Sequence, residues 1–438
     1  MAELSPGLRA RLHHDLEHRL RPMTGRDPGE GGRSATSLEL LYDLTYVIAF
    51  GAAAEQLAHY LAEGHSGPAL GAYAFAIFGV TWAWLNFTWF ASAYDNDYAL
   101  FRVATITQIV GVIVFTFGLP VSFADAAEGG SPNNAMLVIG YIIMRVPLIV
   151  LWLRAAREDP EHRRVDVAYA IVIAVAQTGW VLTILLPLPV ILTSACLGIL
   201  ALAEFVAPVV VERRLGAPPW NAGHIAERFA LLTLITLGEV IAATTGAVGA
   251  LIGEQGWSVA AAVIAASGLL LAAALRWAYN LIPSRALLEE WPGRTMQWRY
   301  AHLPMFGALA AVGAGLGVAT MAVEHGDVTV LSVALALAVP VALVIVMIFV
   351  MWSLLVRSTD LGSHLPLLAV SLVPLAAAVV VGVLAGTGNA MDAEDATDTT
   401  ALVAVIALVA LSAVIEVVGH ERVSYAHTVR AVERAADD

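Results

Sequence analysis

Twelve long apolar stretches dominate this chain, and they constrain its fold more than any other feature. About twenty predominantly apolar residues allow a helix to cross the hydrocarbon core of a bilayer. The stretches lie at residues 39–61, 69–93, 99–122, 134–156, 165–186, 189–211, 224–250, 258–281, 300–322, 328–355, 364–386 and 400–418. With 59% hydrophobic and 13% charged residues and a mean hydropathy of +0.76, they predict an all-α polytopic membrane protein of about 12 transmembrane helices and argue against a soluble globular fold.

The basic residues indicate which connections share one side of the membrane. All 23 are Arg, and nineteen of them lie in the two tails or in loops that follow even-numbered stretches. The opposite loops carry acids instead, such as Asp125, Glu254 and Asp395. Because cytoplasmic loops hold the excess of positive charge, we expect a multi-pass protein of the bacterial cytoplasmic membrane with both termini in the cytoplasm. The net charge of −13 argues against a nucleic-acid partner.

The polar segments between and beyond the stretches predict the domain organisation. We expect a cytoplasmic N-terminal tail at 1–38, a first six-helix half at 39–211, a cytoplasmic linker at 212–223, a second half at 224–418 and a cytoplasmic C-terminal tail at 419–438. In the N-terminal tail, Leu8, Leu12, Leu16 and Leu20 recur every four residues, which predicts a short amphipathic helix.

Short matches between the halves indicate an internal repeat. Glu39, Leu44 and Thr45 recur at the same offset as Glu227, Leu232 and Thr233, and Trp89 matches Trp277. Six spans per half would give both halves the same orientation. The prediction is a parallel 6+6 pseudo-repeat with any central site between the halves.

Ionisable and polar side chains inside the spans are the candidate functional residues, because a charge in hydrocarbon is costly. The main candidates for binding an ion or substrate lie on the first, fourth and seventh spans: Glu39, Tyr42, Asp43, Arg145, His224, Glu227, Arg228 and Glu239. Secondary candidates lie on the second, third, sixth and ninth spans: Asn86, Arg102, Glu204 and His302. The alternative reading of any one of them is a pair that holds two helices together.

Glu239 and Arg145 are the two candidates nearest the middle of the membrane. Glu239 follows Glu227 by twelve residues, which is about 18 Å along a helix. A Glu239–Arg145 pair could be structural, whereas an unpaired Glu239 would be suited to carrying a proton or cation. We expect Glu239 to be the coupling carboxylate with Arg145 as its counter-ion.

No catalytic or metal-binding motif appears in the sequence. Cys-x-x-Cys, a phosphate-binding glycine loop with Lys, and Gly-x-Ser-x-Gly are absent, and the spans contain no His-x-x-x-His. We therefore predict no catalytic residue, no cofactor and no metal site. Asp95-Asn96-Asp97 resembles acidic motifs of lipid transferases, but a solvated turn that caps the third span is the reading we favour.

Two spans carry a family resemblance. The first contains Glu39-Leu40-Leu41-Tyr42-Asp43-Leu44, and the seventh contains His224, Glu227 and Arg228 followed by Gly238-Glu239. Both resemble the motifs of the bacterial low temperature requirement A (LtrA) family, and Trp277 with the segment 300–305 looks like its third landmark. The resemblance implies a multi-spanning membrane protein linked to growth in the cold.

These observations favour a secondary transporter or permeation protein. In this reading Glu39 and Asp43 with Glu227 and Arg228 form an inner gate or a site for substrate and ion. A cation channel, a membrane-embedded lipid-handling enzyme and a structural or assembly factor remain alternatives. The expected partners are membrane lipids and an unknown small solute or ion, and the oligomeric state stays open.

Overall fold

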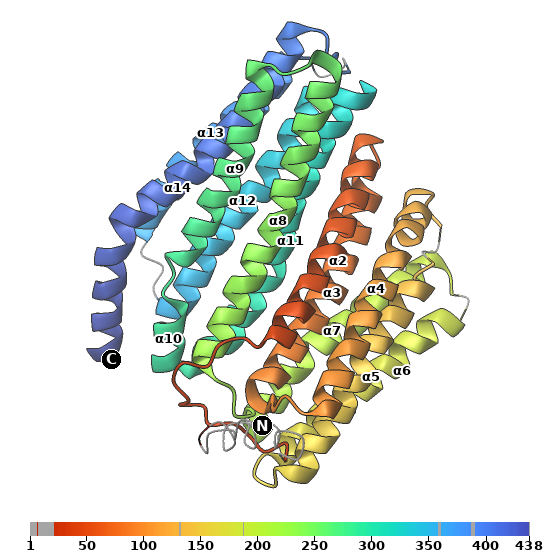
Figure 1. Cartoon of the computed structure of the whole chain (residues 1–438), viewed down its shortest axis with the longest axis vertical. Coiled ribbons are helices and arrows are strands. Elements are labelled where there is room, and N and C mark those ends of the chain that lie inside the picture. The colour runs from red at the N-terminus through yellow and green to blue at the C-terminus, as the bar shows by residue number, and fades with distance from the viewer. Residues whose placement is uncertain are drawn as a thin grey trace, which may run out of the picture. The chain divides into compact units, whose positions relative to one another are not determined.

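The computed structural model describes residues 7, 22–130, 133–186, 188–357, 361–386 and 390–437. Within these ranges the chain forms helices and no strands, and twelve helices or helix pairs are long and apolar enough to cross a membrane. The described helices, of which α9 and the short α10 together count as one span, are in order α2 Ser37–Ala62, α3 Ser66–Tyr94, α4 Ala99–Ala127, α5 Ala135–Glu158, α6 Arg163–Leu185, α7 Val190–Leu215, α8 Ala222–Gln255, α9 Val259–Asn280, α10 Ser284–Glu290, α11 Thr295–His325, α12 Val330–Val356, α13 Leu361–Leu384 and α14 Ala396–Asp437 (Figure 1). A short 3₁₀ turn, Pro292–Arg294, precedes α11. The all-α polytopic fold is confirmed.

The helix ends differ from the predicted spans mainly at α8 and α14. Helix α8 continues to Gln255, and α14 runs without a break from Ala396 to Asp437. The predicted C-terminal tail, 419–438, is therefore mostly a continuation of the last span; it contains no proline to end the helix and several good helix formers. The predicted amphipathic helix of Leu8 to Leu20 lies outside the described residues.

The described chain divides into two compact units. One comprises the described residues up to Thr45 with Trp82–Gly118 and Asn133–Ile225; the other comprises Tyr46–Thr81, Leu119–Pro132 and Ala226–Asp438. Below these are called unit 1 and unit 2. Helices α2, α3, α4 and α8 each contribute residues to both. The 6+6 repeat stays a prediction.

Close backbone contacts hold α4 and α5 together in unit 1. A Cβ at Gly111 would lie 2.7 Å from the Met144 nitrogen, and a Cβ at Gly118 would lie 2.7 Å from the Leu137 nitrogen. Gly140 of α5 approaches the Phe115 backbone of α4 in the same way. Small residues allow transmembrane helices to pack closely, so these glycines determine how the two helices cross.

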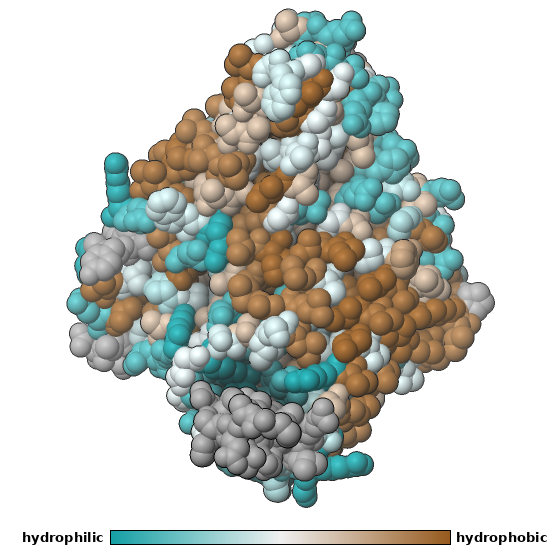
Figure 2. All heavy atoms as spheres, viewed as in Figure 1, coloured by the Kyte–Doolittle hydropathy of each residue, from teal (hydrophilic) through white to brown (hydrophobic). Residues whose placement is uncertain are grey.

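In unit 2, the later helices pack against one another. Helix α11 packs on α12, α13 packs on α12 and α14, and α9 packs on α14. Many large apolar side chains on these spans are exposed, for example Leu269, Val339 and Val373. Hydrophobic side chains cover much of the face drawn in Figure 2. In a chain of this composition, such a surface is suited to lipid.

Candidate functional site

The N-terminal half of α2 has its polar side chains buried and its apolar ones exposed. Glu39, Tyr42, Asp43 and Tyr46 are inaccessible to solvent. The exposed residues on the same turns are aliphatic: Leu40, Leu41, Leu44 and Ile48. This polarity is the reverse of a soluble helix, and it directs every polar candidate of the first span into the protein.

Glu39 is occupied at the start of α2. Its backbone N–H donates to Thr36 Oγ1, and its carboxylate accepts from the Thr36 N–H at 2.9 Å. This reciprocal arrangement is a capping box. The Glu39 carboxylate also lies 3.1 Å from His224 Nε2, and Asn221 accepts from the His224 N–H as the cap of α8. Glu39 and His224 thus join the starts of α2 and α8.

Asp43 and Tyr42 bind neighbouring helices of unit 1. Trp84 Nε1 donates to Asp43 Oδ1 at 2.7 Å, and the Tyr42 hydroxyl lies 3.5 Å from Gln108 Oε1. Asn86, a secondary candidate, donates to the Trp82 carbonyl on its own helix. The predicted candidates Glu39, Tyr42, Asp43 and His224 therefore lie in one hydrogen-bonded region at this end of unit 1.

Arg145 pairs with Glu204, and the predicted role of Arg145 as counter-ion of Glu239 is wrong. Arg145 Nη2 lies 3.2 Å from Glu204 Oε2, and both side chains are almost completely buried. Glu204 also accepts from Tyr141, Trp180 and Gln177. Helices α5, α6 and α7 bring these groups together. Both Arg145 and Glu204 were candidates in the sequence. Their pairing could not be predicted from residue spacing, because spacing does not show that α5 turns Arg145 toward α7.

Glu239 is a candidate near the middle of its helix that has no ion-pair partner among the described residues. It stands seventeen residues after Ala222 and sixteen before Gln255, so it lies at the middle of α8. No hydrogen bond or ion pair with another residue that the structure describes reaches its half-buried carboxylate. Glu55 of α2 and Tyr73 of α3 are close enough to interact with it electrostatically.

Two glycines make room for the Glu239 side chain. A Cβ on Gly51 of α2 would lie 2.6 Å from Glu239 Oε2, and a Cβ on Gly313 of α11 would lie 2.6 Å from Glu239 Cγ. Since real Cβ atoms do not approach so closely, the carboxylate occupies the space that two side chains leave free. Helices α2, α8 and α11 of unit 2 together form this carboxylate pocket, which below means Glu239 with Gly51 and Gly313.

The other candidates of the later spans have separate surroundings. His302 is buried, with Nε2 2.9 Å from the Tyr279 hydroxyl and Nδ1 2.8 Å from the Trp298 carbonyl. Arg228 is fully buried, and Glu227 is half-buried. Arg102 lies in the first turn of α4, a candidate span, as expected, and its exposed side chain pairs with Asp97.

Sequence reasoning missed a buried polar network between α13 and α14. Glu416 accepts from Ser371 at 2.7 Å and lies 2.8 Å from His420 Nδ1, while the Ser412 hydroxyl donates to the Ser371 carbonyl. All four side chains are at most 2% exposed. Glu416 and His420 are four residues apart on one helix face, which was the available signal. It was missed because both stand at the end of the predicted last span.

Residues 22–36 cover the end of unit 1 where α3 ends and α8 begins; below they are called the N-terminal strap. Arg33 donates to the carbonyls of Ala91 and Ser92 at the end of α3, and Arg26 donates to the Asp95 carbonyl. Cations at a helix C-terminus are favourable because the free carbonyls there carry partial negative charge. Burial and the nearby Arg26 lower the pKa of Arg33 to about 10, so Arg33 stays charged at neutral pH.

Other strap contacts reach more distant parts of unit 1. The Gly25 N–H donates to Asp159, and Asn221 Nδ2 donates to the carbonyls of Pro28 and Glu30. Burial raises the pKa of Asp159, but hydrogen bonds from His162 and Gly25 outweigh it and leave this pKa below its ordinary value.

Asp95 lies beneath the strap and is not the solvated residue that we expected. It is 2% exposed, and none of the described residues forms a hydrogen bond with its Oδ2. Burial and the nearby Glu39 carboxylate raise the pKa of Asp95 to about 7, against the opposing effects of the Asp97 N–H and of Arg33 and Arg26. In the part of the chain that the structure describes, no group of three or more His, Cys, Asp or Glu side chains could hold a metal ion.

The fold and its buried charges define a polytopic α-helical membrane protein. A family model described as bacterial low temperature requirement A protein (LtrA) matches residues 34–418. The chain therefore belongs to the LtrA family.

A curated relative adds a partial match. The uncharacterized protein RA0937 of Rhizobium meliloti (strain 1021) is 26% identical over 213 residues, which cover 46% of this chain and 48% of the relative. The alignment thus spans about half of each protein. No solved structure matches the chain.

Proposed function

We propose that this LtrA-family protein is a secondary transporter of the bacterial cytoplasmic membrane, in which Glu239 takes up and releases the coupling proton or monovalent cation. The observation that carries the proposal is a half-buried carboxylate at the middle of a span, without an ion-pair or hydrogen-bond partner among the described residues. An ionised carboxylate is costly in a low-dielectric environment unless a counter-charge accompanies it. A bound proton neutralises the Glu239 carboxylate, and a bound monovalent cation supplies its counter-charge.

The neighbours of Glu239 support a cationic rather than an anionic ligand. Glu55 adds a second negative charge within electrostatic range. Opposite charges attract more strongly where water is scarce, so the two carboxylates favour a cation. Gly51 and Gly313 pack closely against the Glu239 side chain, and neither adds a side chain that could hydrogen-bond or pair with its carboxylate. The transported substrate is a small solute or ion whose identity the proposal leaves open.

The test compares Glu239→Gln with Glu254→Gln in proteoliposomes that contain a pH-sensitive dye. Glu254 lies on the same helix but is exposed near its end, so it is a matched control. An imposed pH gradient is followed while Na⁺ or K⁺ is added outside. We expect cation-dependent proton movement in the wild type and in Glu254→Gln and its loss in Glu239→Gln.

Other results of this experiment contradict the proposal. Unchanged flux in Glu239→Gln would refute the assignment of the carboxylate. Currents without any coupling gradient would indicate a channel. If the wild type shows no flux and Glu239→Gln only lowers the abundance of the protein, Glu239 has a structural role.

A second experiment examines the carboxylate pocket without a known substrate. A hydrophobic carbodiimide reacts with protonated carboxyl groups in apolar surroundings, and peptide mass spectrometry locates the adduct. We expect labelling of Glu239 that Na⁺ or K⁺ reduces. Gly51→Ala should displace the carboxylate and abolish this cation protection, whereas Gly249→Ala, which meets no atom within 4 Å, should retain it. Equal protection in both variants would contradict the pocket.

A further inference from the structure

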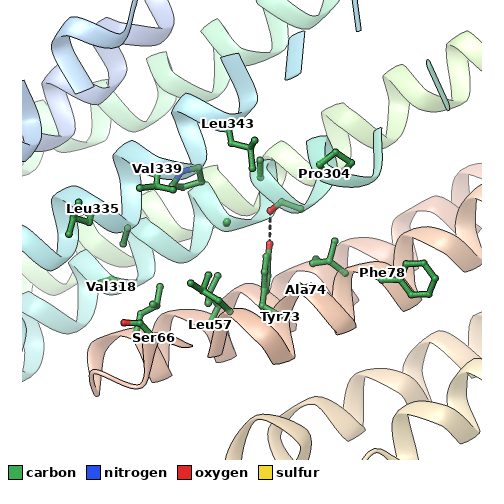
Figure 3. Close-up of a pocket in the computed structure, with 18 of the residues that line it drawn as sticks. Leu57, Ser66, Tyr73, Ala74, Phe78, Pro304, Val318, Leu335, Val339 and Leu343 are labelled. Atoms are coloured by element: carbon green, nitrogen blue, oxygen red, sulfur yellow. Dashed lines mark hydrogen bonds between the residues drawn. The ribbon is translucent and has the colours of Figure 1, made fainter. Parts of the chain in front are cut away.

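Unit 2 contains a cavity whose lining does not include Glu239, Gly51 or Gly313 of the carboxylate pocket. It has a volume of about 580 Å³ and lies among α2, α3, α11 and α12 (Figure 3). This volume falls within the range of about 300–1,000 Å³ that is typical of small-molecule sites. Its walls are almost entirely apolar, with Leu57, Phe78, Pro304 and Leu343 among them. Small residues such as Ala74, Ala311 and Gly307 create the hollow.

The mouth of the cavity lies between membrane-spanning helices. Leu70 of α3 is 54% exposed, and Leu335 and Val339 of α12 are 44% and 61% exposed. All three line the cavity and belong to candidate spans. Exposed aliphatic side chains within a span face hydrocarbon, so the cavity is accessible from the bilayer.

Polar groups mark one end of the cavity. Ser66 is the first residue of α3, and Ser332 is in the first turn of α12, where its N–H is capped by Thr329. Deeper inside, the Tyr73 hydroxyl is occupied because it donates to the Gly307 carbonyl at 2.7 Å (Figure 3). A ligand in this cavity therefore meets polar atoms at the helix ends and hydrocarbon further in.

The length of the cavity corresponds to one leaflet. From Ser66 to Phe78 along α3 is twelve residues, or about 18 Å. From Ser332 to Leu343 along α12 is eleven residues, or about 17 Å. The hydrocarbon core is about 30 Å thick, so one leaflet contributes about half of that depth.

We propose that this cavity binds one acyl chain of a membrane phospholipid, with the lipid's polar end beside Ser66 and Ser332. The apolar walls, the lateral mouth, the polar end and the leaflet-length path all fit such a chain. The proposal concerns a lipid site and does not depend on transport by Glu239.

Lipid retention by the full-length protein tests the proposal. The protein is reconstituted in dioleoyl phosphatidylglycerol vesicles, extracted in mild detergent and examined by native mass spectrometry. Ala74→Phe should fill the mouth and lower the fraction of protein with retained phospholipid by about tenfold. Ala242→Phe is the matched control, because Ala242 is an exposed alanine on a span outside the cavity, and it should retain lipid as the wild type does.

A second variant keeps the test decisive if Ala74→Phe does not fold. Ala311→Leu adds a smaller side chain to the cavity from α11 and should also lower the fraction of protein with retained phospholipid. Folding is checked by the elution profile and the thermal midpoint in detergent. Wild-type retention in the folded cavity variants, or replacement of phospholipid by a different apolar molecule in the wild type, would overturn the proposal.

Discussion

The Arg145–Glu204 pair shows how unevenly two partners can be satisfied. Glu204 accepts from four side chains, whereas Arg145 Nε and Nη1 have no hydrogen-bond partner in the described part of the chain. Removing one member of a buried pair leaves the other uncompensated, at a cost of about 3–5 kcal/mol. The remaining donors would still stabilise Glu204, but Arg145 has no other carboxylate partner among its described contacts.

We therefore expect Glu204→Gln to destabilise the protein more than Arg145→Met. The expected loss is about 3–5 kcal/mol for Glu204→Gln and about half of that for Arg145→Met. The double variant should lose less than the sum because the two sites are in direct contact. Unfolding by denaturing detergent in mixed micelles measures all three, and equal losses for the two single variants would contradict this account.

Asp95 predicts a pH dependence at the end of unit 1 that the N-terminal strap covers. Its pKa is about 7 in the folded protein and near 3.8 as an ordinary side chain, so the folded state binds the proton more tightly. The stability that this group contributes is therefore fully present below about pH 4 and is lost as the pH rises to about 7. Over this range the unfolding equilibrium constant increases by at most about tenfold per pH unit.

Hydrogen exchange of the N-terminal strap measures this effect. Protection of residues 24–35 should be greater at pH 5 than at pH 8 after correction for intrinsic exchange. Asp95→Asn should remove much of the difference, because it deletes the titrating group but keeps the size. Asp97→Asn, at the exposed neighbouring carboxylate, is the control. An undiminished difference in Asp95→Asn would assign the effect to another group.

At the scale of the helices, the network of α13 and α14 predicts a local effect. Glu416→Ala would leave Ser371 and His420 without their acceptor in a buried region. An unsatisfied buried polar group costs about 1–3 kcal/mol. We expect earlier thermal unfolding and faster proteolysis after α13, with Glu394→Gln in an exposed turn as the control. Wild-type proteolysis of Glu416→Ala would show that the network does not hold the two helices.

The predicted spans and the observed helices agree because both follow from hydrophobic length. Backbone N–H and C=O groups in lipid must form hydrogen bonds within their own segment, so in this chain an apolar run of sufficient length is expected to cross the membrane as a helix. The partners of the intramembrane charges could not be predicted in the same way. Glu204 and Glu239 are both acids within spans, yet only Glu204 meets Arg145, and this depends on helix rotation and neighbour choice. The glycines beside Glu239 likewise come from two other helices.

For the whole molecule, the arginine distribution predicts one topology. In a Cys196→Ala background, a cysteine at Glu128 after α4 should react with an impermeant maleimide added to intact cells. A cysteine at Glu289 on α10 should react only after the membrane is made permeable. Both positions are exposed, so access to the reagent depends on sidedness alone. The reverse pattern would invert the topology.

The N-terminal strap has a consequence for how the protein is made. Asn221, which binds the carbonyls of Pro28 and Glu30, follows Pro28 by 193 residues. Translation runs from the N-terminus, so six spans, α2 to α7, leave the ribosome before this contact can form. The contact of the strap with Asn221 can therefore form only after six spans have been synthesised, later than its contacts with Ala91 and Ser92 at the end of α3.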